Sequence, residues 1–406
     1  MFLRNTLVEV LGSQRIATSL QPEVSRFLLS GLGDFSGKAV VLKGVRRAGK
    51  STLQRQLMQR QKQVLYCNLE DTRLFGMTPE DFPALLSVIE ERLPQGGVVF
   101  LDEVQVVEGW ERLVRALLDR GQQVCVTGSN ASLLGKDLGS KLTGRHLSFE
   151  VFPFDYQEFL AFTGRVSGVD SLLAFLDDGG FASYLQGRMD QTLQELLRDI
   201  VQRDIALRHG LRETRHLMNL ALFLLANTGQ TFSMQSLTKS LGIPSVAQTS
   251  RYLEYLADAY LILPLPKFSA SFRRRVTAPN KYYAVDNGLR RANSPQGTPD
   301  RGRRLENQVF LALRSRGENP CYDSEKDLWE CDFVTRTTAI QVCCELTPEN
   351  RRREMRGLLR ASRPVGGPPR GALVVTLDQR ETLVEDGLTI EVVPAWEWLV
   401  RKDHTI

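Results

Sequence analysis

The chain has 406 residues, of which 42% are hydrophobic and 24% are charged, and its formal net charge is +5. This length suffices for two or three domains, each with its own core. The sequence has no apolar run near the roughly 18 residues that a membrane span needs, and its N-terminus lacks the pattern of a secretory signal. We therefore expect a soluble cytoplasmic protein with no membrane partner. We expect its six cysteines to be reduced, since none forms a Cys-x-x-Cys pair.

A phosphate-binding loop is the first motif along the chain. Residues 38–43 form a short apolar run typical of a strand, and Gly44, four further residues, Gly49, Lys50 and Ser51 follow. The glycines let the backbone turn tightly, so that successive N–H groups point at phosphate oxygens. Lys50 would reach the β- and γ-phosphates of ATP, and Ser51 would hold Mg²⁺ at the start of a helix. The expected nucleotide-binding residues are Gly44, Val45, Arg46, Arg47, Ala48, Gly49, Lys50, Ser51 and Thr52.

Two carboxylates end a second predicted strand. Residues 97–101 are apolar, and Asp102 and Glu103 follow directly. A strand-terminal aspartate beside a phosphate loop can hold Mg²⁺, directly or through water. Glu103 would then orient and deprotonate the attacking water. The pair therefore predicts hydrolysis of ATP and not only binding.

A third strand is predicted over 123–128, after a helix over 110–120 whose apolar residues recur at helical spacing. Its end places Thr127, Ser129 and Asn130 where a polar side chain can sense the γ-phosphate or position water. Strands that alternate with helices predict a parallel sheet with its ligand at the carboxyl ends of the strands. We therefore predict an α/β fold whose first domain, residues 1–165, is a P-loop NTPase.

These motifs, with Leu-Thr-Gly-Arg at 142–145 and Phe-Asp-Tyr-Gln-Glu-Phe at 154–159, resemble the AAA+-like ATPases of bacteria and archaea. In particular they resemble predicted ATPases with a C-terminal domain of unassigned function. The resemblance implies that Asn130 (or Ser129) is the first sensor. It makes Arg145 a candidate arginine finger, in cis or on a neighbouring subunit of a homo-oligomer; the alternative is a surface arginine after a turn glycine. The sequence departs from the family at Arg46 and Arg47, where mainly the backbone contributes.

Residues 166–295 are predicted to be a helical lid followed by a helix-turn-helix. Leucines recur at helical spacing over 171–228. Ser233 is the expected cap of a helix that ends at Gly242, and a second helix is expected over 246–259. The segment 261–268, with its prolines, would begin a wing, and the resemblance also implies a winged helix.

If this module binds DNA, its second helix would face the major groove and the following arginines would meet phosphates. In AAA+ proteins such modules often serve only as rigid connectors, and Glu254 and Asp258 would repel phosphates. Both interpretations therefore stay open. The candidate DNA contacts are Gln248, Thr249, Arg251, Tyr252, Arg273, Arg274 and Arg275.

Residues 296–406 resemble a restriction-endonuclease-like nuclease core. A predicted helix carries Glu306, and two predicted hairpin strands carry Asp332 on the first, and Gln341 and Cys343 on the second. Nuclease chemistry needs two carboxylates on Mg²⁺ and a lysine near the attacking water. Gln341 is a poor Mg²⁺ ligand, and the thiol of Cys343 cannot replace an ammonium. We therefore expect a nuclease-like α/β domain with a degenerate, inactive site.

The leading hypothesis is an AAA+-like ATPase that binds ATP and Mg²⁺, hydrolyses ATP and couples its nucleotide state to its C-terminal modules. Double-stranded DNA or DNA-bound proteins are the favoured partners, because a winged helix, arginine clusters and a nuclease-like fold coincide. One alternative is a nucleotide-controlled switch that binds proteins and not DNA. Another is an ATP-dependent nuclease. The sequence predicts neither the physiological substrate nor the oligomeric state.

Overall fold

The structure is a computed structural model that describes residues 4–14, 24–32, 37–130, 142, 144–269, 271, 278–294, 300–364 and 368–401. The chain divides into two units, Met1–Phe152 with Asp258–Tyr260, and Pro153–Ala257 with Leu261–Ile406. Each unit has its own sheet and hydrophobic core. Within the described ranges, every helix is too short or too polar to cross a membrane.

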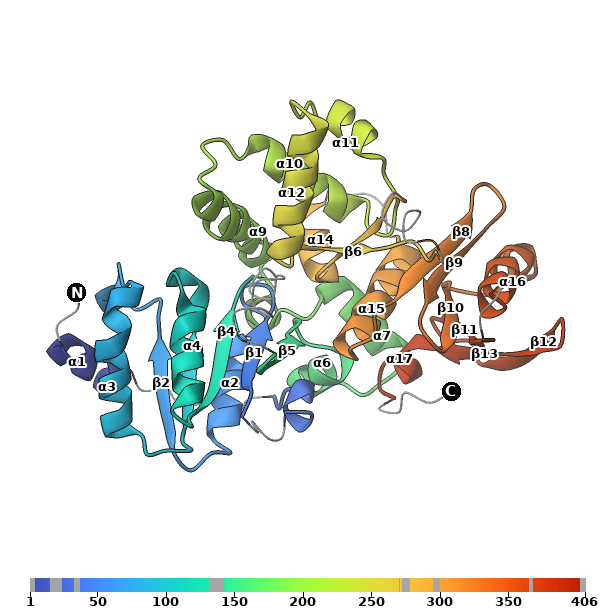
Figure 1. Cartoon of the computed structure of the whole chain (residues 1–406). Helices are drawn as coiled ribbons and strands as arrows, with labels where there is room; N and C mark the ends of the chain where they lie inside the picture. Colours follow the sequence, from blue (N-terminus) through green and yellow to red (C-terminus); the bar gives the residue numbers. More distant parts are fainter. Residues whose placement is uncertain are drawn as a thin grey trace. The chain divides into compact units, whose positions relative to one another are not determined.

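The first unit contains a five-stranded parallel sheet with strand order β2-β3-β4-β1-β5 (Figure 1). Its central strands β1, β3 and β4 are buried on both faces, which explains their continuous apolar sequences. The strands are β1 (Ala39–Lys43), β2 (Val64–Asn68), β3 (Val98–Asp102), β4 (Gln123–Gly128) and β5 (His146–Glu150).

Helices cover this sheet. One core cluster joins α1 (Arg4–Ser13), α3 (Phe82–Arg92) and α4 (Trp110–Asp119) to alternate strand residues such as Val41 and Val126. Helix α2 (Lys50–Met58) lies against β3 and β4, where the Gln54 amide donates to the carbonyls of Leu101 and Cys125. Single 3₁₀ turns complete the unit: η1 (Phe27–Ser30), η2 (Thr72–Leu74), η3 (Pro79–Asp81) and η4 (Val104–Val106).

The predicted strands near 38–43, 97–101 and 123–128 and the predicted helix near 110–120 are confirmed. Strand β2 and helix α3 are additions that the motifs did not predict. Because β4 lies between β1 and β3 and all three run parallel, the segments that follow them leave the sheet at the same edge. That edge carries the phosphate loop, Asp102 and Asn130.

The second unit begins with helices. The predicted helical spacing of 171–228 is confirmed, whereas its role as a lid stays a prediction. The helices are α6 (Tyr156–Thr163), α7 (Val169–Asp178), α8 (Ala182–Gly187), α9 (Asp190–Asp199), the π-helix η6 (Ile200–Leu207) and α10 (Arg215–Ala226).

Two helices joined by a short turn follow. Helix α11 (Met234–Ser240) is capped by Ser233, whose side chain accepts a hydrogen bond from the Ser236 N–H, as predicted. Helix α12 (Val246–Asp258) follows. Strand β6 (Ile262–Leu265) pairs antiparallel with β7 (Lys281–Ala284), and α14 (Asn287–Asn293) comes next. Arg273, Arg274 and Arg275, which were expected on a wing, lie outside the described residues.

The C-terminal part is a six-stranded mixed sheet with strand order β12-β13-β11-β10-β9-β8. Strands β10, β11 and β13 are parallel, and α16 crosses over from β10 to β11 and packs on β9 and β10. The predicted hairpin is confirmed as β9 and β10. The elements are α15 (Arg301–Ser315), β8 (Cys321–Glu325), β9 (Trp329–Val334), β10 (Thr338–Val342), α16 (Pro348–Ser362), β11 (Gly371–Thr376), β12 (Glu381–Glu385), β13 (Leu388–Pro394) and α17 (Ala395–Trp398).

Candidate functional site

The loop after β1 has glycines at the two positions where its backbone is most constrained. A Cβ on Gly44 would lie 2.0 Å from the carbonyl oxygen of Val151, because the chain leaving β5 passes directly beside the loop. Gly49 has φ +92°, and a Cβ there would lie 2.3 Å from the Arg26 guanidinium. A side chain at either position would displace the backbone that is expected to surround a phosphate.

Lys50 begins α2 inside this loop. Its side chain is only 4% exposed, and Nζ lies 4.0 Å from a carboxylate oxygen of Glu103. The ammonium also donates to the carbonyls of Gly44 at 3.0 Å and Val45 at 3.1 Å. The carbonyls of the loop therefore hold the Lys50 ammonium in place beside Glu103, the carboxylate that was predicted to activate water.

Asp102, at the end of β3, accepts hydrogen bonds from three hydroxyl groups. The Ser51 hydroxyl donates at 3.0 Å and the Tyr66 hydroxyl at 2.9 Å, and Thr127 donates to the other carboxylate oxygen. Burial raises the pKa of Tyr66 well above its usual range, and the negative charge of Asp102 raises it further. Ser51 and Asp102 together offer the hard oxygen ligands that Mg²⁺ prefers, so the two residues fit the predicted metal site.

Glu103 turns away from β3 in a left-handed conformation, with φ 53°. Its N–H donates to the Thr127 hydroxyl at 3.0 Å. The amide of Gln105 donates to the Glu103 carboxylate and, at 3.2 Å, to the Ser129 hydroxyl. Gln105, which the motifs did not predict, thus ties the candidate base to the end of β4.

Asn130 and Ser129 follow β4 and are 5% and 6% exposed. Ser129 is linked to Glu103 through the Gln105 amide. The sensor role of Asn130 or Ser129 stays a prediction.

Arg26 braces the phosphate loop, and no motif predicted it. This arginine is 6% exposed. Its guanidinium donates to the carbonyl of Ala48 in the loop at 2.6 Å and to that of Phe152 at 2.7 Å. It therefore fixes the loop to the chain that leaves β5.

We expect Arg26→Met, which keeps the aliphatic stem, to lower the free energy of unfolding by about 2–4 kcal/mol, because two buried carbonyls lose their donors. Arg60→Met is the matched control: Arg60 is exposed and donates to the single carbonyl of Leu29, and we expect a loss below about 1 kcal/mol. Urea unfolding of both variants measures the difference. Equal stability of the two would contradict the bracing role.

Arg145 lies at the opposite edge of the sheet from the phosphate loop. Its carbonyl accepts from the N–H of Ala39 at 2.9 Å, and its guanidinium pairs with Asp119 at 2.6 Å. Strand β1 spans five residues, so at about 3.3 Å per residue the loop begins about 16 Å away. The cis arginine finger is therefore wrong, because the guanidinium cannot touch a phosphate in its own loop. A role in trans stays a prediction.

The candidate DNA contacts on α12 separate into two groups. Arg251 is exposed, whereas Gln248 is half-buried and its amide donates to the Tyr252 hydroxyl at 2.6 Å. Thr249 is 0% exposed and Tyr252 is 5% exposed, and the Thr249 hydroxyl lies 2.7 Å from that of Thr238 on α11. Thr249 and Tyr252 pack α12 against its neighbours, so their prediction as base contacts is wrong.

Two of the predicted residues of the degenerate nuclease site, Glu306 and Asp332, lie beside a lysine that was not predicted. Lys281 on β7 lies 3.3 Å from Glu306, 2.7 Å from Glu330 and 3.6 Å from Asp332. Burial alone would lower the pKa of Lys281, but the three carboxylates raise it well above its usual value. The ammonium is therefore a permanent cation among these acids, and the Tyr283 hydroxyl also donates to Glu306 at 2.6 Å.

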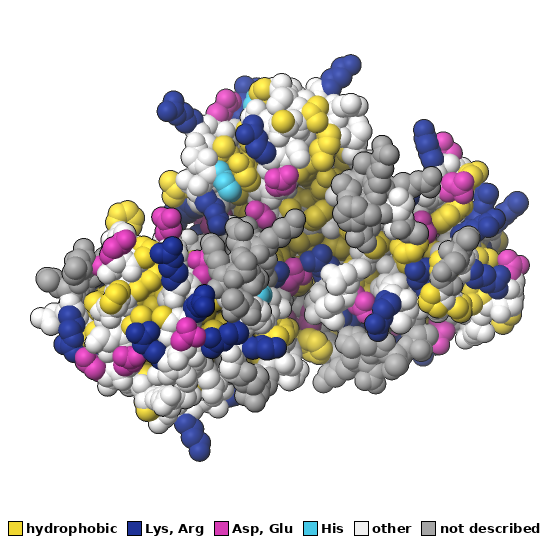
Figure 2. All heavy atoms as spheres, viewed as in Figure 1, with side chains coloured by type: hydrophobic (Ala, Val, Ile, Leu, Met, Phe, Trp, Pro, Cys, Tyr) yellow, Lys and Arg dark blue, Asp and Glu magenta, His cyan; other side chains and the backbone are white. Residues whose placement is uncertain are grey.

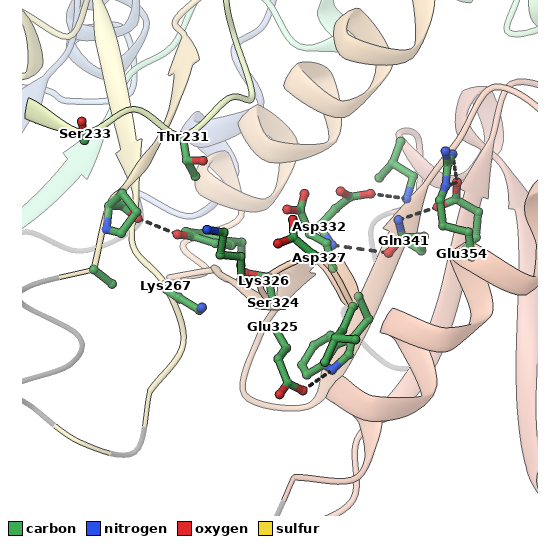
Figure 3. A pocket seen from close by; sticks show the side chains of 18 residues that line it. Thr231, Ser233, Lys267, Ser324, Glu325, Lys326, Asp327, Asp332, Gln341 and Glu354 are labelled. Atoms are coloured by element: carbon green, nitrogen blue, oxygen red, sulfur yellow. Dashed lines mark hydrogen bonds and ion pairs between the residues drawn. The ribbon is translucent and has the colours of Figure 1, made fainter. Parts of the chain in front are cut away.

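Gln341 and Cys343 differ in their relation to this cluster. The Gln341 amide accepts from the Asp332 N–H and donates to Glu354 at 2.7 Å (Figure 3). Cys343 packs in the hydrophobic core, where burial raises its pKa to about 12. A cavity of about 1200 Å³ adjoins Asp332, Gln341 and Glu354. Within the described ranges, no group of three or more His, Cys, Asp or Glu side chains could hold a metal ion.

Asp332 should make stability depend on pH. Burial raises its pKa to about 8 and Glu306 adds to the shift, while Lys281 and the Val342 N–H oppose it. Between about pH 4 and pH 8 the folded state keeps a proton that the unfolded state has lost, so stability falls as pH rises. We expect Asp332→Asn to remove up to about 3 kcal/mol of this decline. Urea unfolding at pH 5, 6, 7 and 8 tests it, and parallel curves for wild type and variant would contradict it.

The comparisons with known proteins agree with this geometry. A model of the AAA domain matches residues 36–160, and a model of a domain of unknown function matches residues 179–300. An uncharacterized protein of Methanocaldococcus jannaschii is 31% identical over 393 residues, which cover 89% of this chain and 88% of that protein. The chain belongs to the family of that protein. An uncharacterized protein of Haemophilus influenzae is 34% identical over 344 residues, covering 76% of this chain and 83% of its own length.

The match at 36–160 confirms the resemblance of the first domain to AAA-type ATPases. This segment is an AAA domain, and its five-stranded parallel sheet is consistent with a P-loop NTPase. A nucleotide-binding ATPase domain is what such a match supports. The match to the solved structure of C. elegans PCH-2 spans 42% of this chain and 45% of that chain at 13% identity, with a TM-score of 0.20.

Proposed function

We propose that the chain binds ATP with Mg²⁺ at the loop Gly44–Thr52 and hydrolyses it. One observation carries the proposal: Ser51 of the loop donates to Asp102 at the end of β3, while Lys50 of the same loop lies beside Glu103. The phosphate-binding, metal-binding and water-activating groups of the sequence thus meet at one edge of the sheet. This is the arrangement that hydrolysis at a P-loop requires.

Each residue has a distinct part in the proposed reaction. The loop's N–H groups and the Lys50 ammonium bind the phosphates, and Ser51 and Asp102 hold Mg²⁺, which supplies charge neutralisation when bound. Glu103 accepts a proton from the water whose oxygen attacks the γ-phosphorus. The bond from that phosphorus to the β–γ bridging oxygen then breaks, and ADP leaves with the electron pair. Asn130 or Ser129 orients the water or the γ-phosphate.

Phosphate release from ATP by the full chain, with Mg²⁺ or with excess EDTA, tests the proposal. We expect release that depends on Mg²⁺. ATP binding without any release would reduce the proposal to a nucleotide-binding protein.

We further propose that the nucleotide state acts on the modules that follow the first domain. The proposed division is 1–165 for the ATPase domain, 166–295 for the helical and winged-helix region and 296–406 for the nuclease-like domain. Arg145 would act in trans in a homo-oligomer. Measurement of the molecular mass with and without ATP tests that point, and a monomer under both conditions would exclude it.

Double-stranded DNA is a second candidate ligand. Helices α11 and α12 are joined by a turn as in a helix-turn-helix, and α12 exposes Arg251. The degenerate site argues against cleavage, because the Lys281 ammonium already lies among its carboxylates and compensates their charge. We therefore propose DNA binding without nuclease activity. A nucleotide-controlled switch that binds only proteins would show no affinity for DNA at low salt.

A further inference from the structure

Helix α16 exposes a row of arginines along one face. Arg352, Arg356 and Arg360 are exposed and follow one another at intervals of four residues. Arg353 and Arg363 are exposed nearby. The opposite face is buried, with Met355, Leu358 and Ala361 in the core of the C-terminal sheet. We call Arg352, Arg356 and Arg360 the arginine stripe. In Figure 2, dark-blue side chains gather at the right of the view, where Figure 1 places α16.

Among the described residues, the three arginines of the stripe find no acidic partner for their charge. Within the described part of the chain, none of their guanidinium groups forms an ion pair or a hydrogen bond. Arginines beside them do: Arg351 pairs with Glu385 at 2.8 Å, and Arg353 pairs with Glu354. The stripe therefore holds three full positive charges toward solvent, although the chain has 47 acidic residues.

The charge of the stripe complements a phosphodiester backbone. The stripe extends for about 12 Å along the helix axis, and a DNA duplex carries one negative charge per about 1.7 Å of its axis, so several phosphates fall within its length. Each guanidinium can then donate two hydrogen bonds to a phosphate. We propose that α16 is a sequence-independent docking surface for double-stranded DNA, which the stripe contacts through the phosphate backbone.

Other anionic partners fit this face less well. A helix that binds a membrane surface needs an exposed apolar side, whereas the apolar side of α16 is buried in the core. A protein partner is usually anchored by buried aromatic or apolar groups, and the exposed face of α16 offers arginines and the single acid Glu349. Recognition by charge alone is typical of a nucleic-acid backbone.

The inference deepens the DNA candidate and rests on it, but it does not depend on hydrolysis. Fluorescence anisotropy of a labelled duplex of about 30 base pairs with the nucleotide-free full chain measures binding at several salt concentrations between about 50 and 200 mM. The test variant is Arg352→Glu/Arg356→Glu/Arg360→Glu. The control is Arg165→Glu/Arg198→Glu/Arg336→Glu, three exposed arginines elsewhere, which lowers the net charge by the same amount.

We expect the stripe variant to bind DNA at least about 30-fold more weakly at low salt, with the salt slope reduced by up to about 3, and the control to change binding less than about 3-fold. A milder triple change to Gln, checked by circular dichroism, keeps the test valid if charge reversal impairs folding. Equal losses for both triples, loss only with Arg251→Glu, no binding by the wild type, or tighter binding of single-stranded RNA or a poly-glutamate peptide would each overturn the proposal. Phosphate release from ATP remains a separate measurement, so failure of DNA binding leaves the ATPase proposal untouched.

Discussion

Glu103→Gln is expected to lower ATP turnover by at least about 100-fold and to leave ATP affinity nearly unchanged. A positioned general base contributes about 10²–10⁴-fold to the rate, and the amide keeps the size of the side chain but cannot accept the proton. The amide can still meet Gln105 and Lys50 through its carbonyl oxygen, so the fold of the loop is preserved. Steady-state phosphate release and equilibrium titration with ATP measure the two quantities separately.

Glu108→Gln is the matched control for this change. Glu108 is exposed on the same connection between β3 and α4, and its replacement should leave turnover within about 2-fold of the wild type. If Glu103→Gln hydrolyses ATP at the wild-type rate, Glu103 is not the base.

Lys50→Ala is expected to weaken ATP binding by at least about 100-fold, which corresponds to about 2.7 kcal/mol. The ammonium is nearly buried, so its attraction to phosphate is screened less than that of a surface charge. The change also removes two hydrogen bonds to the loop's carbonyls, which adds disorder to the phosphate site. Isothermal titration with ATP and Mg²⁺ measures the loss.

Lys62→Ala, at an exposed lysine beyond the end of α2, serves as its control and should bind ATP normally. Thermal unfolding of Lys50→Ala separates a local effect from loss of the fold. Folded Lys50→Ala protein that binds ATP with wild-type affinity would show that the loop is not the phosphate site.

The parts that the sequence predicts well are those encoded within a few neighbouring residues. The strand before Gly44, the strand that ends at Asp102 and the cap at Ser233 all follow from local apolar runs or a capping side chain. Parallel order then brings the ends of β1, β3 and β4 to one edge, since the segments between them form helices. The nucleotide-site residues that were predicted from motifs accordingly lie together.

The parts that the sequence did not predict depend on contacts between distant segments. Arg26 has no motif of its own, and it reaches the loop only because β5 returns beside β1. Lys281 meets Asp332 through the packing of β7 near β9. Arg145 was assigned from a resemblance, but its place at the start of a strand sets it at the wrong edge. Thr249 was expected to contact DNA, yet its hydroxyl forms a hydrogen bond with that of Thr238 on α11.

Single-turnover hydrolysis of ATP, with the full chain in excess over nucleotide, is the sharpest test of whether the loop Gly44–Thr52 is a hydrolytic site. We expect bound ATP to become ADP and phosphate when Mg²⁺ is present, and we expect excess EDTA or Glu103→Gln to prevent this conversion while ATP stays bound. ATP that remains intact on the wild-type chain with Mg²⁺, or hydrolysis that proceeds equally in Glu103→Gln, would contradict the claim that Asp102 and Glu103 make this loop a hydrolytic site.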